Sequence, residues 1–304
     1  MNESFILSEF DKLVNSGVVI YNDNAVVIEH IDRDLKFQFL LTSALAKKPT
    51  IQSTPATPKP IAEDEDQKQK GSDINTHGFE IDQITSSHFL IANKFSWARP
   101  HLMLLTSDGY RRQYEALDLD DFRSIWSLLS TFHTTDYVVF YNCGQDGGCS
   151  RLHKHLQLIP TPRNLFASFL DAKDGEREPP RVPFEWFYHR LDSNDWDPER
   201  LLEIYNHLLE QATKTASRDL SENPKWVPST AATPHNFILT KRWMVVLPRR
   251  RAAVNAEAGV NAIGMLGYIV VATQKEIDNW VQLGLTGSLE KLGVAKQGDN
   301  LLAN

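Results

Sequence analysis

The stretch from Gly147 to Pro160, GGCSRLHKHLQLIP, alternates polar and apolar residues directly after a loop of small residues. In an extended strand, side chains two positions apart lie on the same face. The alternation therefore predicts a strand with one polar face made of His153, His155 and Gln157. The opposite face would carry Leu152, Lys154, Leu156 and Leu158.

The loop before this strand contains Gly144, Gly147 and Gly148, and Ser150 adds a hydroxyl group. Glycines let backbone N–H groups come close to an anion such as phosphate. A nucleophilic imidazole nitrogen beside a phosphate cradle predicts phosphoryl or nucleotidyl transfer through a covalent histidine intermediate.

Two alternatives stay open for the histidine pair. The imidazoles could bind a metal ion together, or they could be hydrogen-bonded groups of the core. Cys143 and Cys149 lie close by, but the loop between them has no recognisable metal-ligand spacing. A metal centre is therefore the weaker alternative.

Composition and charge exclude several classes of protein. The chain has 304 residues, of which 41% are hydrophobic and 23% charged, as is typical of a globular protein. A net charge of −7 argues against a broad surface for nucleic acid. We find no apolar run long enough to span a membrane and no signal peptide at the polar N-terminus. We expect a cytoplasmic protein with access to the nucleus and no membrane partner.

Hydrophobic periodicity outlines the N-terminal elements. It predicts a helix over 3–15, a strand from 37 that ends near Lys47 and Lys48, and two strands within 88–106 joined through Pro100. A helix over 117–133 would be capped by Asp118 or Asp120, and a strand would follow over 136–142. The buried stripe of that helix would consist of Phe122, Ile125, Trp126 and Leu129.

The C-terminal elements follow a linker-like stretch at 171–183. Asp197 and Pro198 open a helix, 235–249 forms a strand hairpin, and 264–273 forms a strand that precedes a helix over 274–285. Residues 50–73 are rich in proline, threonine and charge and predict a mobile excursion. Recurrent hairpins mixed with helices favour an α+β fold with a mainly antiparallel sheet.

Residues 140–160, FYNCGQDGGCSRLHKHLQLIP, resemble the signature of the histidine-triad superfamily. The resemblance is to the branch with glutamine in place of the last histidine. That branch includes galactose-1-phosphate uridylyltransferase and the fungal diadenosine tetraphosphate phosphorylase (ATP adenylyltransferase) family. Stretches 43–49, 91–95, 235–249 and 260–271 resemble the phosphorylase family in the same order. The resemblance implies two related halves, at 1–170 with a flexible excursion over 50–76, and at 184–304.

The resemblance also implies roles for individual residues. His155 would attack the α-phosphate, Gln157 would contact the phosphate and assist the leaving group, and His153 would orient the strand. Lys48 would be a phosphate ligand. The full set of implied substrate-binding residues is Lys48, Asn93, Lys94, Asn142, Gly148, Cys149, Ser150, Arg151, Asn261, Ala262 and Ile263.

The implied activity is nucleotidyl transfer. Phosphate would cleave diadenosine tetraphosphate to ADP and ATP through a nucleotidyl-histidine, and the reverse reaction would build it. The partners would be ATP, ADP, diadenosine polyphosphates and phosphate. No cofactor would be tightly bound, although Mg²⁺ could accompany the nucleotide. The chain would be a monomer or a homodimer. The alternatives are a dinucleoside polyphosphate hydrolase, a nucleotide-hexose uridylyltransferase and a non-catalytic nucleotide-binding sensor.

Four positions depart from the phosphorylase pattern and keep the sensor alternative open. Cys149 occupies the place of a serine, Arg151 adds a cation, and Tyr268 and Ala272 replace an expected methionine and lysine. The run Arg249–Arg251 either forms a solvated turn or faces the polyphosphate; we favour the turn.

Overall fold

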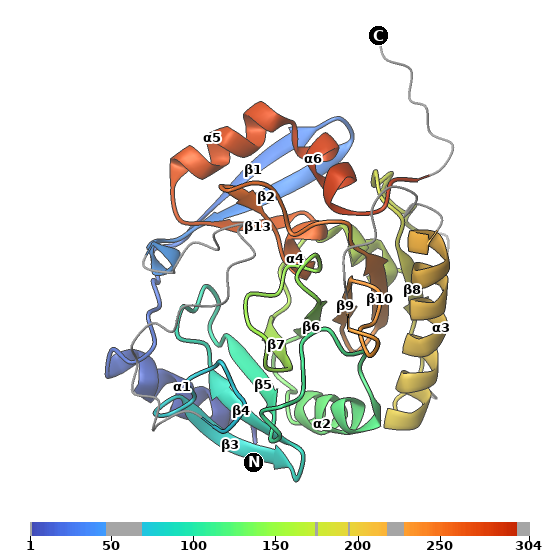
Figure 1. Cartoon of the computed structure of the whole chain (residues 1–304). Helices are drawn as coiled ribbons and strands as arrows, with labels where there is room; N and C mark the ends of the chain where they lie inside the picture. The colour runs from blue at the N-terminus through green and yellow to red at the C-terminus, as the bar shows by residue number, and fades with distance from the viewer. Residues whose placement is uncertain (1, 47–68, 174–175, 194, 218–227, 297–304) are drawn as a thin grey trace.

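The structure is a computed structural model that describes residues 2–46, 69–173, 176–193, 195–217 and 228–296 (Figure 1). Within these residues, eight antiparallel strands form a central sheet in the order β3–β4–β5–β7–β6–β9–β10–β8. The strands are β3 (Glu80–Thr85), β4 (His88–Ala92), β5 (Leu102–Thr106), β6 (Tyr137–Cys143), β7 (His155–Pro160), β8 (Phe187–Arg190), β9 (His235–Leu239) and β10 (Trp243–Pro248). The mainly antiparallel α+β fold is confirmed.

A smaller sheet joins the two ends of the chain. Strands β1 (Val26–Asp32) and β2 (Leu35–Leu41) form an antiparallel hairpin, and β13 (Tyr268–Val271) pairs in parallel with β2. A two-stranded ribbon is formed by β11 (Ala253–Asn255) and β12 (Ala258–Gly259). The proposed division into 1–170 and 184–304 falls between β7 and β8. Strands of both regions share the central sheet through the β6–β9 pair.

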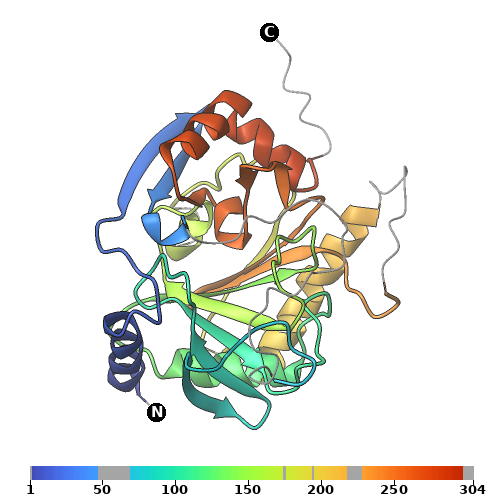
Figure 2. The same ribbon diagram turned by 60° about the vertical axis from the view of Figure 1, so that its left-hand side comes forward.

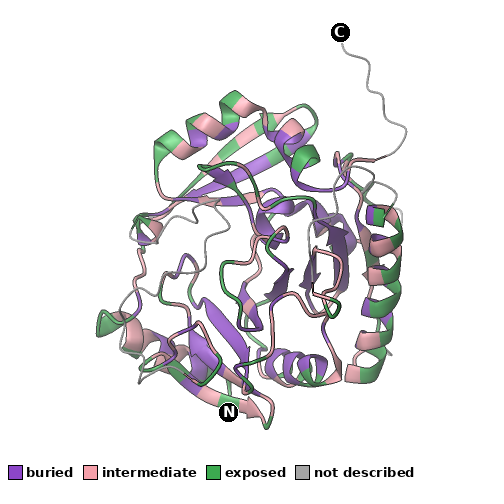
Figure 3. Ribbon diagram, viewed as in Figure 1, coloured by how far each residue is buried: buried purple, intermediate pink, exposed green. Residues whose placement is uncertain are grey.

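The inner strands β5, β6, β9 and β10 of the central sheet consist of buried residues (Figure 3). Helices α1 (Glu3–Asn15), α2 (Leu119–Ser130) and α3 (Pro198–Ser217) contribute to the apolar cluster on one face. The other face packs against the smaller sheet and the C-terminal helices, as Figures 1 and 2 show. The helices on this face are η3 (Phe166–Asp171), α4 (Ala262–Met265), α5 (Gln274–Leu283) and α6 (Leu285–Leu292). Alternation along β6 separates the faces: Val139 and Tyr141 belong to the first cluster, Val138 and Phe140 to the second.

Most of the predicted elements are confirmed at or near their expected bounds. The helix over 3–15 is α1, the hairpin over 235–249 is β9 and β10, and the helix that begins at Pro198 is α3. Asp118 caps α2, because its side chain accepts the N–H groups of Asp120 and Asp121. Among the described helices, none is both long and apolar enough to cross a membrane.

Three local predictions are wrong. The strand from residue 37 does not continue toward Lys47, because the Thr42 side chain accepts the Ala44 N–H and starts a 3₁₀ turn, η1 (Ser43–Leu45). The strand over 264–273 is shortened to β13 by α4, which Asn261 caps. Trp126 is 39% exposed, and its indole N–H donates to the Trp196 carbonyl at the surface.

The predicted excursion over 50–76 falls largely outside the described residues, which resume at 69. From there the chain is anchored. Gln69 donates to the Ser107 carbonyl, Arg112 donates to the Gly71 carbonyl, and Ile74 is buried. The expectation of a mobile segment is therefore wrong for 69–76, where loop 107–112 supplies the missing partners.

Candidate active site

The candidate site lies where β6 and β7 separate. Their ladder runs from Tyr137 opposite Pro160 to Phe140 opposite Gln157. Beyond this point β6 continues against β9, whereas residues 152–154 pair with residues 111–113, which we call the wedge. The Lys154 N–H donates to the Arg111 carbonyl at 3.0 Å, and Arg112 and His153 form an isolated bridge. We call this separation the fork; it places the H-K-H motif at the entrance to β7.

His155 has the geometry of a nucleophile. Its Nδ1 lies 2.8 Å from the His153 carbonyl oxygen, and a carbonyl only accepts, so Nδ1 carries the proton. The lone pair is therefore on Nε2, to which no described residue hydrogen-bonds. Burial lowers the pKa of His155 to about 4, so the imidazole is neutral at pH 7. A neutral ring with an unoccupied Nε2 can attack phosphorus.

His153 is held at both ring nitrogens. Its Nε2 lies 3.0 Å from the Thr106 carbonyl oxygen and must donate to it, so Nδ1 accepts from the Ser72 hydroxyl at 2.8 Å. The backbone N–H of His153 donates to Asp73 Oδ1 at 2.8 Å. His153 thus has no free nitrogen for chemistry. It positions the carbonyl that orients the ring of His155.

Gln157 contacts a histidine that the sequence did not single out. His101 Nε2 lies 2.9 Å from Gln157 Oε1 and 3.2 Å from Asn93 Nδ2. The Trp97 ring packs edge-on against His101, and the Tyr268 ring lies 6.2 Å from Trp97. Tyr268, which belongs to the C-terminal region of the chain, is therefore linked to Gln157 through the rings of Trp97 and His101.

Lys94, the second residue of the predicted asparagine-lysine pair, is placed differently from Asn93. Lys94 is exposed, and its Nζ lies 5.9 Å from the Phe95 ring centroid. Asn93 Oδ1 accepts the Phe95 N–H, which fixes the amide that faces His101. The structure brings Asn93 to the motif and leaves Lys94 at the surface.

The glycine loop is shaped by close backbone contacts. A Cβ atom at Gly147 would lie 2.1 Å from the Cys143 carbonyl oxygen, and Gly148 has a φ of +91°. The N–H groups of Gly147, Gly148 and Cys149 donate to carbonyls within the loop. The expectation that these groups face an anion is therefore wrong for this conformation, because the tight turn uses them itself.

The residues after the turn remain at the surface. Ser150 and Arg151 are exposed, and Arg151 donates to the Asp73 carbonyl at 3.4 Å. Cys149 is partly buried; burial, followed by the charges of Asp73 and Asp146, raises the pKa of its thiol to about 12. A thiol with so high a pKa is protonated at neutral pH and is a weak nucleophile.

A buried polar network joins the fork to the C-terminal region. Asn142 Oδ1 accepts from Asn236 Nδ2 at 3.0 Å and from the Ala262 N–H at 2.8 Å. Asn261 accepts the Gly264 N–H as the cap of α4, and Ile263 is a core residue. Of these predicted residues, Asn142 and the Ala262 N–H form the network, whereas Asn261 caps α4 and Ile263 packs in the core.

Arg249 belongs to the same network, so the predicted solvated turn at 249–251 is wrong for this residue. It is 3% exposed and donates to Asn236 Oδ1 at 2.6 Å and to the Val260 carbonyl. Burial lowers the pKa of Arg249 to about 9, although Asp146 raises it. Arg250 and Arg251 are exposed. The guanidinium is therefore engaged in hydrogen bonds within the folded chain, including one to the Gly147 carbonyl of the glycine loop.

Lys48 lies outside the described residues. Ala272 is half-buried and donates its N–H to Glu276 Oε2, so it belongs to the start of α5.

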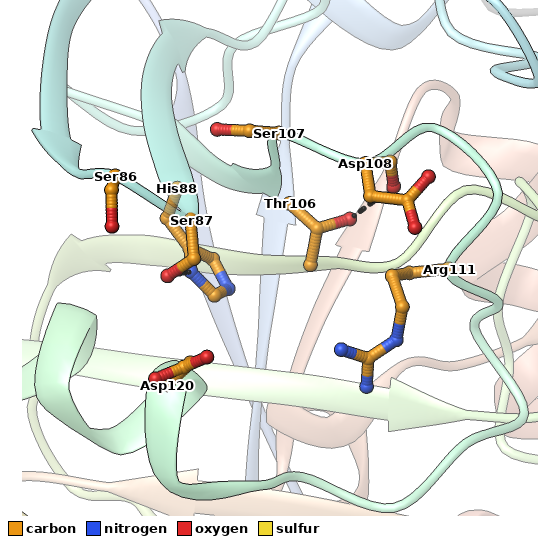
Figure 4. Close-up of a pocket in the computed structure, with 8 residues that line it drawn as sticks. All are labelled: Ser86, Ser87, His88, Thr106, Ser107, Asp108, Arg111 and Asp120. Carbon is orange, nitrogen blue, oxygen red and sulfur yellow. Dashed lines mark hydrogen bonds between the residues drawn. The ribbon is translucent and has the colours of Figure 1, made fainter.

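A cavity of about 370 Å³ lies beside the end of β5 (Figure 4). Its wall residue Thr106 hydrogen-bonds to the His153 ring at 3.0 Å, but no sequence-predicted site residue lines it. The lining residues are Ser86, Ser87, His88, Thr106, Ser107, Asp108, Arg111 and Asp120. Among the described residues, no three His, Cys, Asp or Glu side chains gather as a metal-ion site.

Comparisons with known proteins match both regions of the chain. The model of the Ap4A phosphorylase N-terminal domain matches residues 27–168, and that of the ATP adenylyltransferase C-terminal domain matches residues 180–295. Diadenosine 5',5'''-P1,P4-tetraphosphate phosphorylase 2 of Saccharomyces cerevisiae is 30% identical over 214 residues. Protein APA1 of the same yeast is 29% identical over 200 residues. These matches cover 62% and 60% of this chain, and 64% and 60% of the two relatives.

Solved structures of yeast Ap4A phosphorylase Apa2 share the fold over 98% of the chain. Yeast Ap4A phosphorylase Apa2 has a TM-score of 0.75 at 21% identity, over 98% of this chain and 99% of that chain. The structure of Apa2 in complex with Ap4A gives a TM-score of 0.72 at 22% identity, over 98% and 99%. At these identities the likeness establishes the fold alone.

Proposed function

Because the chain belongs to the Ap4A phosphorylase and ATP adenylyltransferase family of enzymes, we propose that it transfers an adenylyl group from diadenosine tetraphosphate to phosphate. The products would be ATP and ADP, and the reverse reaction would use the same site. The observation that carries the proposal is the neutral, buried His155 with a free Nε2 at the fork.

The reaction proceeds in two displacements. Nε2 of His155 attacks the α-phosphorus of one adenylyl group, the bond to the bridging oxygen breaks, and ATP leaves. Phosphate then attacks the same phosphorus, the bond to Nε2 breaks, and ADP leaves. The imidazole gains positive character in the first step, and the His153 carbonyl at Nδ1 stabilises it. Gln157 lies two residues further along β7, where its amide can contact the non-bridging oxygens.

The negative charge of the polyphosphate has to be balanced by cations, and the described residues of the site provide few of them. Arg151 is the exposed cation next to the motif, and Lys48 is assigned to the phosphates by the resemblance alone. We propose that Mg²⁺ enters with the nucleotide and takes its ligands from phosphate oxygens and water. The proposal requires no protein-bound metal.

The acceptor is tested by incubating the chain with diadenosine tetraphosphate, with and without inorganic phosphate, and with and without Mg²⁺. Phosphate-dependent release of equal amounts of ADP and ATP is expected. Release of AMP and ATP without phosphate would indicate a hydrolase. Turnover of a nucleotide-hexose in its place would indicate a uridylyltransferase, and binding without turnover would indicate a sensor.

The pH dependence should report the lowered pKa of His155. Only the neutral ring attacks, and its pKa is about 4, below the ordinary imidazole value. We expect kcat/KM for diadenosine tetraphosphate, at saturating phosphate, to stay level from pH 8 to about 5 and to fall about tenfold per pH unit once the ring protonates.

The measurement is the initial rate of ATP release after a brief exposure to each pH. Enzyme returned to pH 7.5 serves as the control, because it separates protonation from unfolding. A decline centred near the ordinary imidazole pKa of about 6.5 would contradict a buried nucleophile.

A further inference from the structure

Gln113 lies in the fork and is 1% exposed. It is the last residue of the wedge, on the segment between β5 and α2. Nothing in its sequence surroundings, GYRRQYEAL, sets it apart from its polar neighbours. A fully buried glutamine is unusual, because its amide must find partners for both of its polar atoms.

Every hydrogen-bonding group of Gln113 has a partner at the site. Its side-chain Oε1 accepts the His155 N–H at 2.8 Å, and its Nε2 donates to the His155 carbonyl at 2.9 Å and to the Asn142 carbonyl at 3.2 Å. Its own N–H donates to the Leu152 carbonyl, and its carbonyl accepts from the Gly144 N–H and the Tyr141 hydroxyl. One residue thus bonds to both arms of the fork.

The register of the sheet explains why this amide is needed. Continuing the β6–β7 ladder past Phe140 and Gln157 would place Asn142 directly opposite His155. Because the strands separate there, the ladder cannot satisfy the buried backbone groups of these two residues. The Gln113 amide bonds to three of these groups, which are the His155 N–H, the His155 carbonyl and the Asn142 carbonyl. It therefore holds the fork open while it fixes the backbone of His155.

We propose that Gln113 is a positioning residue for His155 in the proposed adenylyl transfer, and this inference rests on that function. Its amide clamps both backbone groups of His155, and the His153 carbonyl holds the ring from the other side. Together these contacts fix the direction of the Nε2 lone pair. All of these contacts are within the protein, so Gln113 acts on the reaction through His155 and not by binding the nucleotide.

The test compares Gln113→Ala and Gln113→Glu with the unchanged chain. Gln113→Ala should slow formation of the adenylyl-histidine by about 10²-fold, the cost expected of a misplaced reacting atom, with little change in KM. Gln113→Glu keeps an acceptor for the His155 N–H, but an ionised carboxylate cannot donate to the His155 and Asn142 carbonyls. Its rate should rise as the pH falls and the introduced carboxyl group gains a proton, whereas the unchanged chain stays level over the same range.

Thr240→Val is the matched control. Thr240 is buried at the β9–β10 turn, remote from the fork, and its Oγ1 accepts the N–H groups of Arg242 and Trp243. This variant should lose stability while kcat, KM and the pH profile stay unchanged. If it slows adenylylation as much as Gln113→Ala does, the effect of Gln113 is general destabilisation and the inference fails.

The outcomes separate this inference from the proposed function. Normal adenylylation in the unchanged chain and in Gln113→Ala would leave the function intact and remove the role of Gln113. If the unchanged chain forms no adenylyl-histidine, the function fails. The clamp is then read from amide hydrogen exchange, in which the His155 N–H should exchange faster in Gln113→Ala than in Thr240→Val. Equal exchange would overturn the clamp as well.

Discussion

His155→Ala is expected to abolish covalent adenylyl transfer and to lower turnover by on the order of 10⁴-fold or more. The proposed route depends on the Nε2 lone pair of this ring, and no other described imidazole at the fork offers one. His153 uses both ring nitrogens, and His101 Nε2 faces Gln157 and Asn93. Removing His155 therefore removes the nucleophile without a substitute.

The direct measurement traps the intermediate with ADP labelled at the α-phosphate, because the reverse of the second displacement transfers its adenylyl group to His155 and releases phosphate. A phosphoramidate is labile in acid and stable in alkali, so digestion and separation are carried out under alkaline conditions. Label should appear on the peptide that contains His155 and should be missing in the variant. His155→Gly should regain part of its activity with added imidazole, which can enter the vacated space.

His235 provides a matched control within the chain. It is fully buried, burial lowers its pKa to about 4, and its Nδ1 lies 2.7 Å from the Thr233 carbonyl, two residues earlier, as in His155. The difference is at Nε2, which accepts from the Tyr205 hydroxyl at 3.0 Å. His235→Ala should lose stability and keep the label. Label that persists without His155 would move the nucleophile elsewhere.

The sequence predicted the parts of the site that depend on local patterns. Alternation along 154–159 holds, because Lys154, Leu156 and Leu158 are buried toward α2 and α3 while Ile159 faces the opposite core. It fails at Leu152, which is 48% exposed, because the wedge bends the chain away before β7 begins. A period-two pattern identifies a strand but does not show where its partners diverge.

The missed residues depend on contacts between distant segments. His101 reaches Gln157 across 56 positions, and Gln113 reaches His155 across 42. His101 directly precedes β5, all of whose residues are buried, so no alternation distinguishes its ring. Arg249 follows a proline and begins a run of three arginines, a pattern that is typical of a solvated turn. Its burial depends on the Val260 carbonyl and Asn236, which only the folded chain brings together.

The largest expected effect on stability comes from replacing Lys154, which lies between the two histidines. Its side chain is 0% exposed, and Nζ donates to Asp121 Oδ2 at 2.6 Å and to the Ala116 carbonyl at 2.8 Å. Asp121 also accepts from His88 and from the Asp118 N–H at the start of α2. This buried ion pair therefore fastens the H-K-H motif to the helix beneath the sheet.

Lys154→Met should lower the free energy of unfolding by about 3–5 kcal/mol, because it leaves the buried Asp121 carboxylate without its cation. The measurement is urea unfolding at pH 7. Lys275→Met is the control: its ion pair with Glu257 has the same 2.6 Å length, but the two side chains are 79% and 42% exposed. Water screens that pair, so the control should change stability little. Equal losses in the two variants would show that burial does not strengthen the Lys154 contact.

Acid unfolding gives an independent measure of the same pair. Burial by itself would raise the pKa of Asp121, but the hydrogen bond from His88 and the charge and hydrogen bond of Lys154 lower it to about 2. A lowered carboxyl pKa stabilises the fold above the ordinary value and loses that contribution as the pH falls toward the folded value. Lys154→Met removes two of these lowering influences and so raises the folded-state pKa of Asp121; the variant should therefore lose less stability than the unchanged chain as the pH falls through this window. Adding Asp121→Asn should restore part of the stability at pH 7, because the double variant no longer buries an unpaired charge. A double variant whose loss equals the sum of the two single losses would mean that Lys154 and Asp121 are not coupled.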